Sequence, residues 1–359
     1  MLTDFIVVVV GLALLVGGAQ SLVRGASRLA LALGVPPLIV GLTIVAIGTS
    51  APELGVSVQS ALSGQSAIVL GNVVGSNIYN VLFILGICAT ISPLAVAPRL
   101  IRLDVPVMIG SAAAVQVAAL DGRIGRVDGA LFLAGVALYT LFIAAQARRE
   151  QNSTAAKGEE LDQAVKPDRR YGLHLLYIGA GFALLGFGSD LLVDGSVRIA
   201  QALGVSEVVI GMTVVTLGTT APELTTCLVA SLKGQPDVAV GNIVGSNIYN
   251  VLAVLGVGAV LTPGGIVVSD DVRDFGIPVM VAVCFSCLPI FFGGRTIRRW
   301  EGGLFLAYFA IYVAYLMLEA LHDVRLVTLR NTVIWFVVPL TVTAIAVSVY
   351  REYRGKSSS

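Results

Sequence analysis

The sequence Gly41-Leu-Thr-Ile-Val-Ala-Ile-Gly-Thr-Ser-Ala-Pro-Glu53 returns 170 residues later as Gly211-Met-Thr-Val-Val-Thr-Leu-Gly-Thr-Thr-Ala-Pro-Glu223. A second block, Gly71-Asn-Val-Val-Gly-Ser-Asn-Ile-Tyr-Asn80, returns at the same offset as Gly241-Asn-Ile-Val-Gly-Ser-Asn-Ile-Tyr-Asn250. Across the region that holds both blocks, 25 of 46 aligned positions are identical without a gap. The chain is therefore an internal duplication followed by a carboxyl-terminal addition.

The composition predicts a membrane protein. Apolar residues make up 56% of the 359 residues, charged residues make up 13%, and the mean hydropathy is +0.90. Soluble proteins carry roughly 25% charged residues. Apolar runs such as 67–93 and 333–350 are long enough to cross a bilayer. We therefore expect an all-α polytopic membrane protein, and the net charge of +1 gives no support to binding of nucleic acid.

Each half of the duplication contains five apolar segments, which gives ten predicted spans. They are expected at 4–20, 27–62, 67–93, 103–120 and 128–147, and at 172–192, 198–232, 238–262, 275–293 and 302–320. An eleventh apolar run at 331–350 has no partner. Because five is an odd number, the two halves enter the membrane in opposite senses, which predicts an inverted repeat.

These segments define the expected organisation of the chain. The segments 27–62 and 198–232 are too long for one straight crossing, so we expect each to break at its Gly-Thr-Ser/Thr-Ala-Pro-Glu block. The acidic Asp4 in the first segment is atypical of a secretory signal, so this segment is expected to be a retained span. The expected units are a first repeat at 1–147 with its motifs at 41–86, a cytoplasmic linker at 148–171, a second repeat at 172–320 with its motifs at 211–256, and an extra span and tail at 321–359.

The positive charges predict the orientation of the chain. With the amino terminus outside, 17 of the 23 Lys and Arg residues fall in inner loops and six in outer loops. Inner loops of membrane proteins are enriched in Lys and Arg. We therefore expect the amino terminus outside and the carboxyl terminus inside.

Glu53 and Glu223 lie deep inside apolar segments, where an ionised carboxylate is unfavourable by at least a few kcal/mol without a partner. No Lys or Arg lies nearby in the sequence. One alternative is a protonated Glu bonded to a neighbouring helix. Because the same unfavourable residue occurs twice at symmetry-related positions, an ion site is the better interpretation.

Oxygen atoms surround each glutamate in the sequence. Thr49 lies one helical turn before Glu53, and Pro52 has no N–H, so the Gly48 carbonyl loses its donor. Thr219, Gly218 and Pro222 repeat this arrangement beside Glu223. The adjoining span adds Asn72, Ser76 and Asn80, echoed by Asn242, Ser246 and Asn250, although helix–helix hydrogen bonding is an alternative role for Asn72 and Asn242.

Two carboxylates and many neutral oxygens, without sulfur or imidazole, favour hard cations that take oxygen ligands. Ca²⁺ and Na⁺ fit this description, and Mg²⁺ and Mn²⁺ are alternatives. Two negative charges are balanced by one Ca²⁺ or by two or more Na⁺. Mutually exclusive occupancy of a site near the membrane centre predicts an exchanger. A passive cation channel and an intramembrane metal-dependent hydrolase are the competing classes, but the sequence offers no obvious catalytic base except the two glutamates.

The two paired blocks closely resemble the alpha repeats of the cation/Ca²⁺ exchanger superfamily, in particular its prokaryotic Na⁺/Ca²⁺ exchangers. The resemblance covers about residues 5–320. It implies a non-enzymatic antiporter in a prokaryotic plasma membrane, with Ca²⁺ and Na⁺ as transported substrates and no resident cofactor. It also implies ligands for the transported ions at the following positions of this chain: Glu53, Glu223, Thr49, Thr219, Ser50, Thr220, Ser76, Ser246, Asn80, Asn250, and the backbone carbonyls of Ala46 and Thr216.

The chain departs from related branches at two motif positions. Some relatives, including K⁺-dependent exchangers, carry Asp where this chain has Asn250, which argues against K⁺ co-transport. H⁺/Ca²⁺ relatives usually carry a Gly-Asn-Ala-Val-Glu type of block at the position of 48–53. Its absence favours Na⁺ over H⁺ as the counter-ion, with an H⁺/Ca²⁺ antiporter as the alternative.

Overall fold

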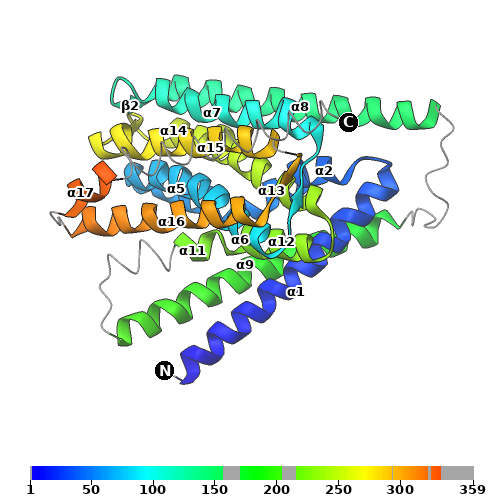
Figure 1. Cartoon of the computed structure of the whole chain (residues 1–359), viewed down its shortest axis with the longest axis horizontal. Helices are drawn as coiled ribbons and strands as arrows, with labels where there is room; N and C mark the ends of the chain where they lie inside the picture. The colour runs from blue at the N-terminus through cyan, green and yellow to red at the C-terminus, as the bar shows by residue number, and fades with distance from the viewer. Residues whose placement is uncertain (1, 157–169, 204–215, 293, 322–324, 333–359) are drawn as a thin grey trace, which may run out of the picture.

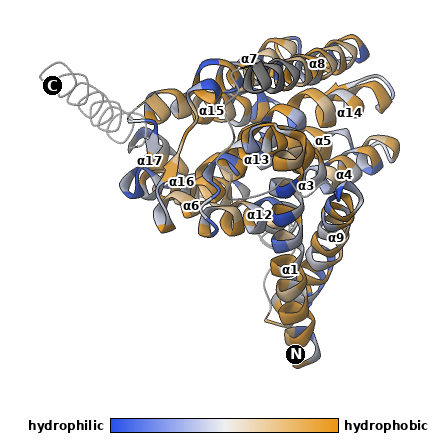
Figure 2. Ribbon diagram, turned by 90° about the vertical axis from the view of Figure 1, so that its right-hand side faces the viewer, coloured by the Kyte–Doolittle hydropathy of each residue, from blue (hydrophilic) through white to orange (hydrophobic). Residues whose placement is uncertain are grey.

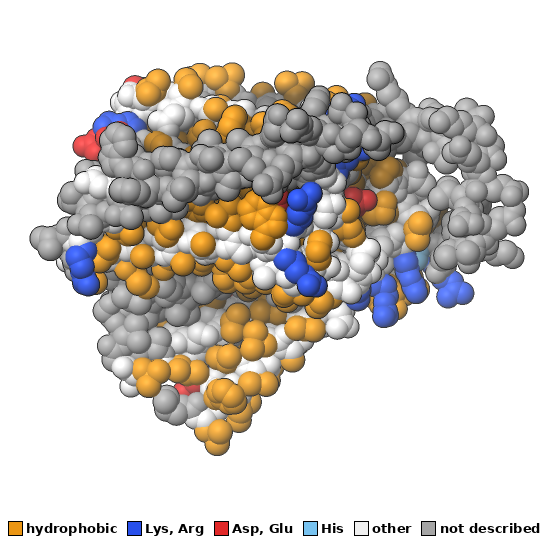
Figure 3. Space-filling model, viewed as in Figure 1, with side chains coloured by type: hydrophobic (Ala, Val, Ile, Leu, Met, Phe, Trp, Pro, Cys, Tyr) orange, Lys and Arg blue, Asp and Glu red, His pale blue; other side chains and the backbone are white. Residues whose placement is uncertain are grey.

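The computed structural model describes residues 2–156, 170–203, 216–292, 294–321 and 325–332, and these are almost entirely helical. Most long helices lie side by side in Figure 1, whereas α1 (Leu2–Leu33) and α9 (Tyr171–Ala202) cross them obliquely as a pair. Hydrophobic side chains cover much of the face shown in Figure 3. The protein is a helical polytopic membrane protein, as the composition predicts.

The elements of the two repeats follow each other in the same order, with η denoting π-helical turns. After α1, the first repeat contains α2 (Pro37–Val40), η1 (Gly41–Val45), α3 (Ala46–Thr49), α4 (Ala51–Leu62), α5 (Ser66–Tyr79), η2 (Asn80–Leu85), α6 (Gly86–Ile91), β1 (Leu94–Ala95), η3 (Leu100–Asp104), α7 (Val105–Ala118), β2 (Arg123–Ile124) and α8 (Arg126–Ala156). After α9, the second contains α11 (Thr216–Thr219), α12 (Ala221–Leu232), α13 (Pro236–Tyr249), η5 (Asn250–Leu255), α14 (Gly256–Leu261), β3 (Ile266–Val267), η6 (Val272–Gly276), α15 (Ile277–Phe292), β4 (Thr296–Ile297), α16 (Arg299–Ala320) and α17 (Arg325–Thr332).

Nine of the ten predicted repeat spans correspond to described helices. Eight helical segments are long and apolar enough to cross a membrane, and the bent pair Pro37–Thr49 and Ala51–Leu62 adds a ninth. The remaining predicted span, 198–232, includes residues 204–215, which lie outside the described residues. The predicted eleventh span at 331–350 also lies outside them, apart from the end of α17.

The first helix of each repeat is longer than predicted. The sequence predicts an end near residue 20 and a new span from 27, but α1 continues to Leu33. No proline interrupts the segment, and the helix ends where Gly34 adopts a φ of 65° ahead of Pro36. In the same way, α9 runs to Ala202, ten residues beyond the predicted end at 192. The helix α8 likewise continues to Ala156, into the predicted linker.

The predicted break in the second segment is present in the first repeat. The helical segment Pro37–Thr49 and α4 meet at an angle of 41°. Ser50 lies between them with a φ of −80° and a ψ of 6°, and Pro52 lies in the first turn of α4. Because proline cannot donate the helical hydrogen bond, the break falls beside Glu53. The same order of residues separates α11 from α12 in the second repeat.

Two short strand pairs, which the all-α prediction did not include, show that the repeats are inverted. The equivalent strands β1 and β3 do not pair with each other; β1 pairs with β4 and β2 pairs with β3, both antiparallel. The helix of η6 and α15, about 30 Å long at 1.5 Å per residue, separates β3 from β4. The end of the first repeat that carries β1 therefore meets the opposite end of the second repeat. The side of the membrane on which each terminus lies stays a prediction.

Glycines at symmetry-related positions join the two repeats. A Cβ atom on Gly302 of α16 would lie 2.8 Å from the Gly86 carbonyl oxygen, and a Cβ atom on Gly129 of α8 would lie 2.8 Å from the Gly256 carbonyl oxygen. Real Cβ atoms do not approach an oxygen this closely. Each crossing brings the backbones of different repeats together, as small residues do in other membrane helices.

Replacing Gly302 with alanine is expected to destabilise the fold by about 1–3 kcal/mol, because the added methyl group would overlap the backbones of Gly86 and Thr90. The neighbouring Gly303 has nothing within 4 Å of its Cβ position, so Gly303→Ala is the matched control. The thermal midpoint in detergent should fall for the first variant only. An equal shift for both variants would contradict the close crossing.

Candidate functional site

The helices α5 and α13, one from each repeat, lie near the centre of the bundle in Figure 2. The helix α13 is buried along almost its whole length. A Cβ atom on Gly245 would lie 2.7 Å from that of Ala46, and one on Gly241 would lie 3.1 Å from the Leu38 carbonyl oxygen. The two glycines of the repeated block therefore allow α13 to approach the broken segment of the first repeat closely.

Glu53 and Glu223 lie in the first turns of α4 and α12, and each is 1% exposed. The partial positive charge at the start of each helix favours a carboxylate there. None of their four carboxylate oxygens has a hydrogen-bond partner among the described residues. Because a buried charge without a partner is unfavourable by several kcal/mol, this arrangement calls for a cation to complete it.

The two glutamates belong to one site. The carboxylate of Glu223, from the second repeat, lies close to Glu53, Thr49 and Ser50 of the first repeat. Thr49 and Ser50 are 1% and 3% exposed, and Ser50 Oγ has no hydrogen-bond partner within the described part of the chain. The site is therefore assembled across the interface between the repeats.

Thr49 connects the broken segment to α13. Its hydroxyl group donates to Asn242 Oδ1 at 3.1 Å and lies 3.4 Å from Ser246 Oγ. The Ala46 carbonyl, a predicted ligand, accepts the Ser50 N–H at 3.1 Å and lies 3.4 Å from Thr49 Oγ1. The structure thus brings the predicted residues Ala46, Thr49 and Ser246 together in one buried polar cluster.

The second-repeat residues around Glu223 are less symmetrical. The Gly218 carbonyl, predicted to lack a helical donor, accepts a hydrogen bond from Ser189 Oγ of α9 at 2.5 Å. Thr220 is buried and Thr219 is partly exposed. Thr216 begins α11, but its side chain lies outside the described residues. The structure therefore describes the predicted ligands of the first repeat more completely than those of the second.

Asn80 and Asn250 each begin a π-helical turn, η2 and η5, and each is 1% exposed. Such turns often occur at functional sites. The Oδ1 atoms of both residues, and Ser76 Oγ, have no hydrogen-bond partner among the residues that the structure describes. The turn η2 contacts α12 and η5 contacts α4, so each asparagine lies on an element that packs against a glutamate-bearing helix.

Asn72 has the alternative, helix-joining role. Its amide group donates to the Glu53 backbone carbonyl and to Ser57 Oγ, both at 3.0 Å. Two further residues that were not predicted from the sequence, Asn77 and Asn247, are buried between α5 and α13. They fall outside the four-residue stripe, but their recurrence at the same offset in both blocks was a signal that could have found them.

Two hydrogen bonds join α1 to the second repeat. Ser27 of α1 donates to Gln235 Oε1 at 2.6 Å, and Lys233 donates to the Gln20 carbonyl at 3.5 Å. These contacts attach α1 to the loop between α12 and α13. The counterpart of Gln235 in the first repeat, Gln65, is exposed. These contacts lie at the end of the bundle that the charge count predicts to be cytoplasmic.

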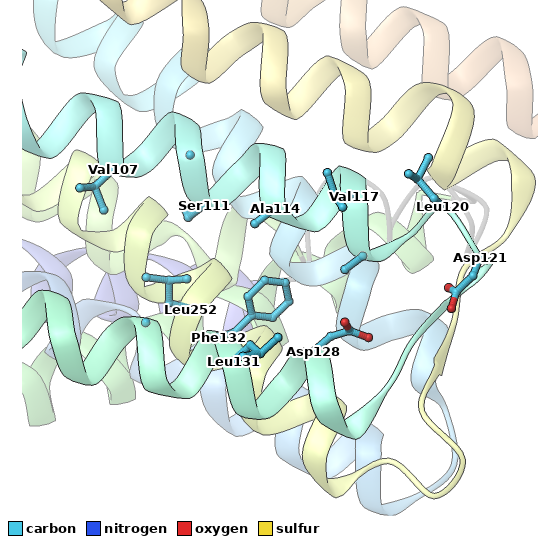
Figure 4. Close-up of a pocket in the computed structure, with 13 residues that line it drawn as sticks. Val107, Ser111, Ala114, Val117, Leu120, Asp121, Asp128, Leu131, Phe132 and Leu252 are labelled. Carbon is cyan, nitrogen blue, oxygen red and sulfur yellow. The ribbon is translucent and has the colours of Figure 1, made fainter.

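A cavity of about 810 Å³ lies away from this site, between α7 and α8 (Figure 4). Its lining is mainly apolar, with Phe132 and Leu252 at its side and Asp121 and Asp128 near one end. It contains none of the predicted ligand residues. The buried oxygen cluster around Glu53 and Glu223 is therefore separate from this cavity.

The donor set determines which ions this cluster suits. It consists of carboxylate, amide, hydroxyl and carbonyl oxygens, and no group of three His, Cys, Asp or Glu side chains occurs among the described residues. Oxygen donors with two negative charges suit Ca²⁺ and Na⁺ and do not suit soft metals.

Comparison with known proteins identifies the class of protein to which this fold and donor set belong. The family model described as sodium/calcium exchanger protein matches residues 3–146 and 173–318. The chain therefore belongs to this family, which consists of cation/Ca²⁺ antiporters and not of enzymes. The match confirms the resemblance predicted from the two repeated blocks.

Individual relatives are similar over most of the chain. Inner membrane protein YrbG of Escherichia coli is 36% identical over 289 residues, which cover 80% of this chain and 89% of the relative. Sodium/calcium exchanger MaX1 of Methanosarcina acetivorans is 30% identical, with 88% and 97% coverage. The solved structure of the sodium/calcium exchanger from Methanococcus jannaschii gives a TM-score of 0.73 at 29% identity, with 87% and 97% coverage.

Replacing Glu53 or Glu223 with glutamine is expected to weaken Ca²⁺ binding by at least about 100-fold, because each change removes one of two charges that face the ion at low dielectric. Calorimetry on purified protein would measure this loss. In buffer free of both Ca²⁺ and Na⁺, the same variants should melt at a higher temperature than the original protein, since two unpartnered buried carboxylates repel each other.

The matched control is Glu319→Gln near the end of α16, where the side chain is partly exposed. This variant should bind Ca²⁺ as the original protein does. Binding within threefold of the original for both Glu53→Gln and Glu223→Gln would show that the ion lies elsewhere.

Proposed function

We propose that this protein exchanges Ca²⁺ for Na⁺ across the membrane by alternating access, with Glu53 and Glu223 as shared ligands of the transported cations. The observation that carries the proposal is the pair of buried carboxylates, one from each repeat, without hydrogen-bond partners in the described chain. Their two charges are balanced either by one Ca²⁺ or by two or more Na⁺, so the two kinds of ion compete for one site.

The inverted repeats supply the second requirement of such a mechanism, which is access from alternate sides. Thr49, Ser50, Ser76, Ser246, Asn80 and Asn250, with Thr219 and Thr220 and the carbonyls of Ala46 and Thr216, are the proposed additional ligands. The names of MaX1 and of the exchanger from M. jannaschii support Na⁺ as the counter-ion.

The similarity to an inner membrane protein of E. coli supports a place in a prokaryotic plasma membrane. The neutral Asn250 supports exchange without K⁺. The absence of a third carboxylate from the described cluster also fits this assignment, because a further cation would add positive charge without a compensating group.

Purified protein in sealed vesicles loaded with Na⁺ is expected to accumulate radioactive Ca²⁺ from a Na⁺-free medium. Uptake should stop when a Na⁺ ionophore dissipates the gradient, because release of Na⁺ is coupled to entry of Ca²⁺. Vesicles with the Glu223→Gln variant, incorporated at the same density, are the control and should show no uptake above background.

Two outcomes would contradict this proposal in different ways. Equal Ca²⁺ uptake driven by an H⁺ gradient alone would identify H⁺ as the counter-ion. Ca²⁺ flux down its own gradient, with no counter-ion on the opposite side, would identify a passive channel.

A further inference from the structure

Four asparagine side chains form a hydrogen-bonded set where α5 and α13 meet. Asn77 Nδ2 donates to the Asn247 backbone carbonyl at 3.3 Å, and Asn247 Nδ2 donates to the Asn77 backbone carbonyl at 3.4 Å. Asn80 Nδ2 donates to Asn247 Oδ1 at 2.9 Å, and Asn250 Nδ2 donates to Asn77 Oδ1 at 3.2 Å. All four residues are at most 1% exposed.

The backbone carbonyls determine which way each amide points. A carbonyl oxygen only accepts hydrogen bonds, so the end of the Asn77 amide that faces it must be the NH₂ group. The Asn77 oxygen then lies at the other end, facing Asn250, which must present its own NH₂ group there. Asn250 Oδ1 therefore points away from the set, and the same chain of bonds from Asn247 orients Asn80.

The sulfur atoms of two methionines reinforce this orientation. Met280 Sδ lies 3.6 Å from Asn77 Nδ2, and Met108 Sδ lies 3.6 Å from Asn247 Nδ2. Thioether sulfur is a weak acceptor and offers no donor. It therefore suits the NH₂ end of an amide and does not suit the oxygen end.

The oxygens that these bonds turn outward are Asn80 Oδ1 and Asn250 Oδ1, which are buried and have no hydrogen-bond partner in the described residues. If either amide rotated by half a turn, its NH₂ group would take the place of the oxygen. A cation would then meet a positive dipole instead of a ligand. Asparagine is useful in such a site only if something fixes its orientation.

We propose that Asn77 and Asn247 are positioning residues, which hold the amides of Asn80 and Asn250 with their oxygens toward the transported Ca²⁺. This inference rests on the proposed exchange at Glu53 and Glu223. It assigns a role to two residues that make no contact with the ion, and it makes each repeat orient the ligand of the other, because Asn77 acts on Asn250 and Asn247 acts on Asn80.

The test uses Asn77→Leu, which keeps the shape of the side chain but removes its hydrogen bonds. The apparent KM for Ca²⁺ in vesicles, and the dissociation constant in detergent, should each rise by about tenfold. A merely structural role for Asn77 would also predict some loss. The decisive comparison is therefore the same substitution in the Asn250→Asp background.

A carboxylate at position 250 presents an oxygen at either end and needs no orienting partner. In that background, Asn77→Leu should change the KM and the dissociation constant by less than about twofold. An equal rise in both backgrounds, or no rise in the original background, would overturn the proposal. The substitutions Asn247→Leu and Asn80→Asp form the equivalent test with the roles of the two repeats exchanged. They replace the first pair of variants if those variants do not fold.

Thr140→Val is the matched control, because it removes a partly buried hydrogen bond to Tyr249, next to Asn250, without touching the four amides. It should leave both Ca²⁺ constants unchanged. An original protein that neither binds nor transports Ca²⁺ would refute the proposed exchange and this inference together. If the original protein binds and transports Ca²⁺, and the Asn77 and Asn247 variants have the same Ca²⁺ constants as the original, this inference alone would be refuted.

Discussion

Two carboxylates, Glu53 and Glu223, are buried at the interface of the repeats without hydrogen-bond partners among the described residues. In a low-dielectric interior their charges repel each other and attract any cation strongly. The neighbouring elements can be understood from this constraint. The helices break beside each glutamate, so that the start of a helix faces each charge. Glycines bring α13 close enough to add Thr49, Ser246 and Asn242 to the same cluster.

The sequence was sufficient to predict the parts of the structure that depend on the duplication. The two repeated blocks predicted the inverted architecture, the break beside Glu53 and the pair of glutamates, because each is a feature that occurs twice at one offset. The lengths of α1 and α9 could not be predicted in this way. Arg24 and Arg28 resembled loop residues, but both are exposed on α1, which continues past them to Leu33.

Contacts between the repeats were the other part that the sequence could not provide. Hydrophobic periodicity assigns residues to faces of one helix, but it does not say which helix of the other repeat covers that face. The pairing of β1 with β4 and the bonds of Asn77 with Asn247 depend on this choice. The alternative role considered for Asn72, helix joining, agrees with its bond to the Glu53 carbonyl.

The strand pairs and the glycine crossings show that the unit of duplication differs from the unit of packing. The residues Gly86 and Gly302, and Gly129 and Gly256, fasten spans of different repeats to each other. The helices α1 and α9 instead pack mainly on one another, and they lie as a separate arm in Figure 2. The helices α1 and α9 therefore stand apart from the larger body, in which the other spans of both repeats pack together. The ancestral gene boundary, by contrast, passes through the middle of the larger body.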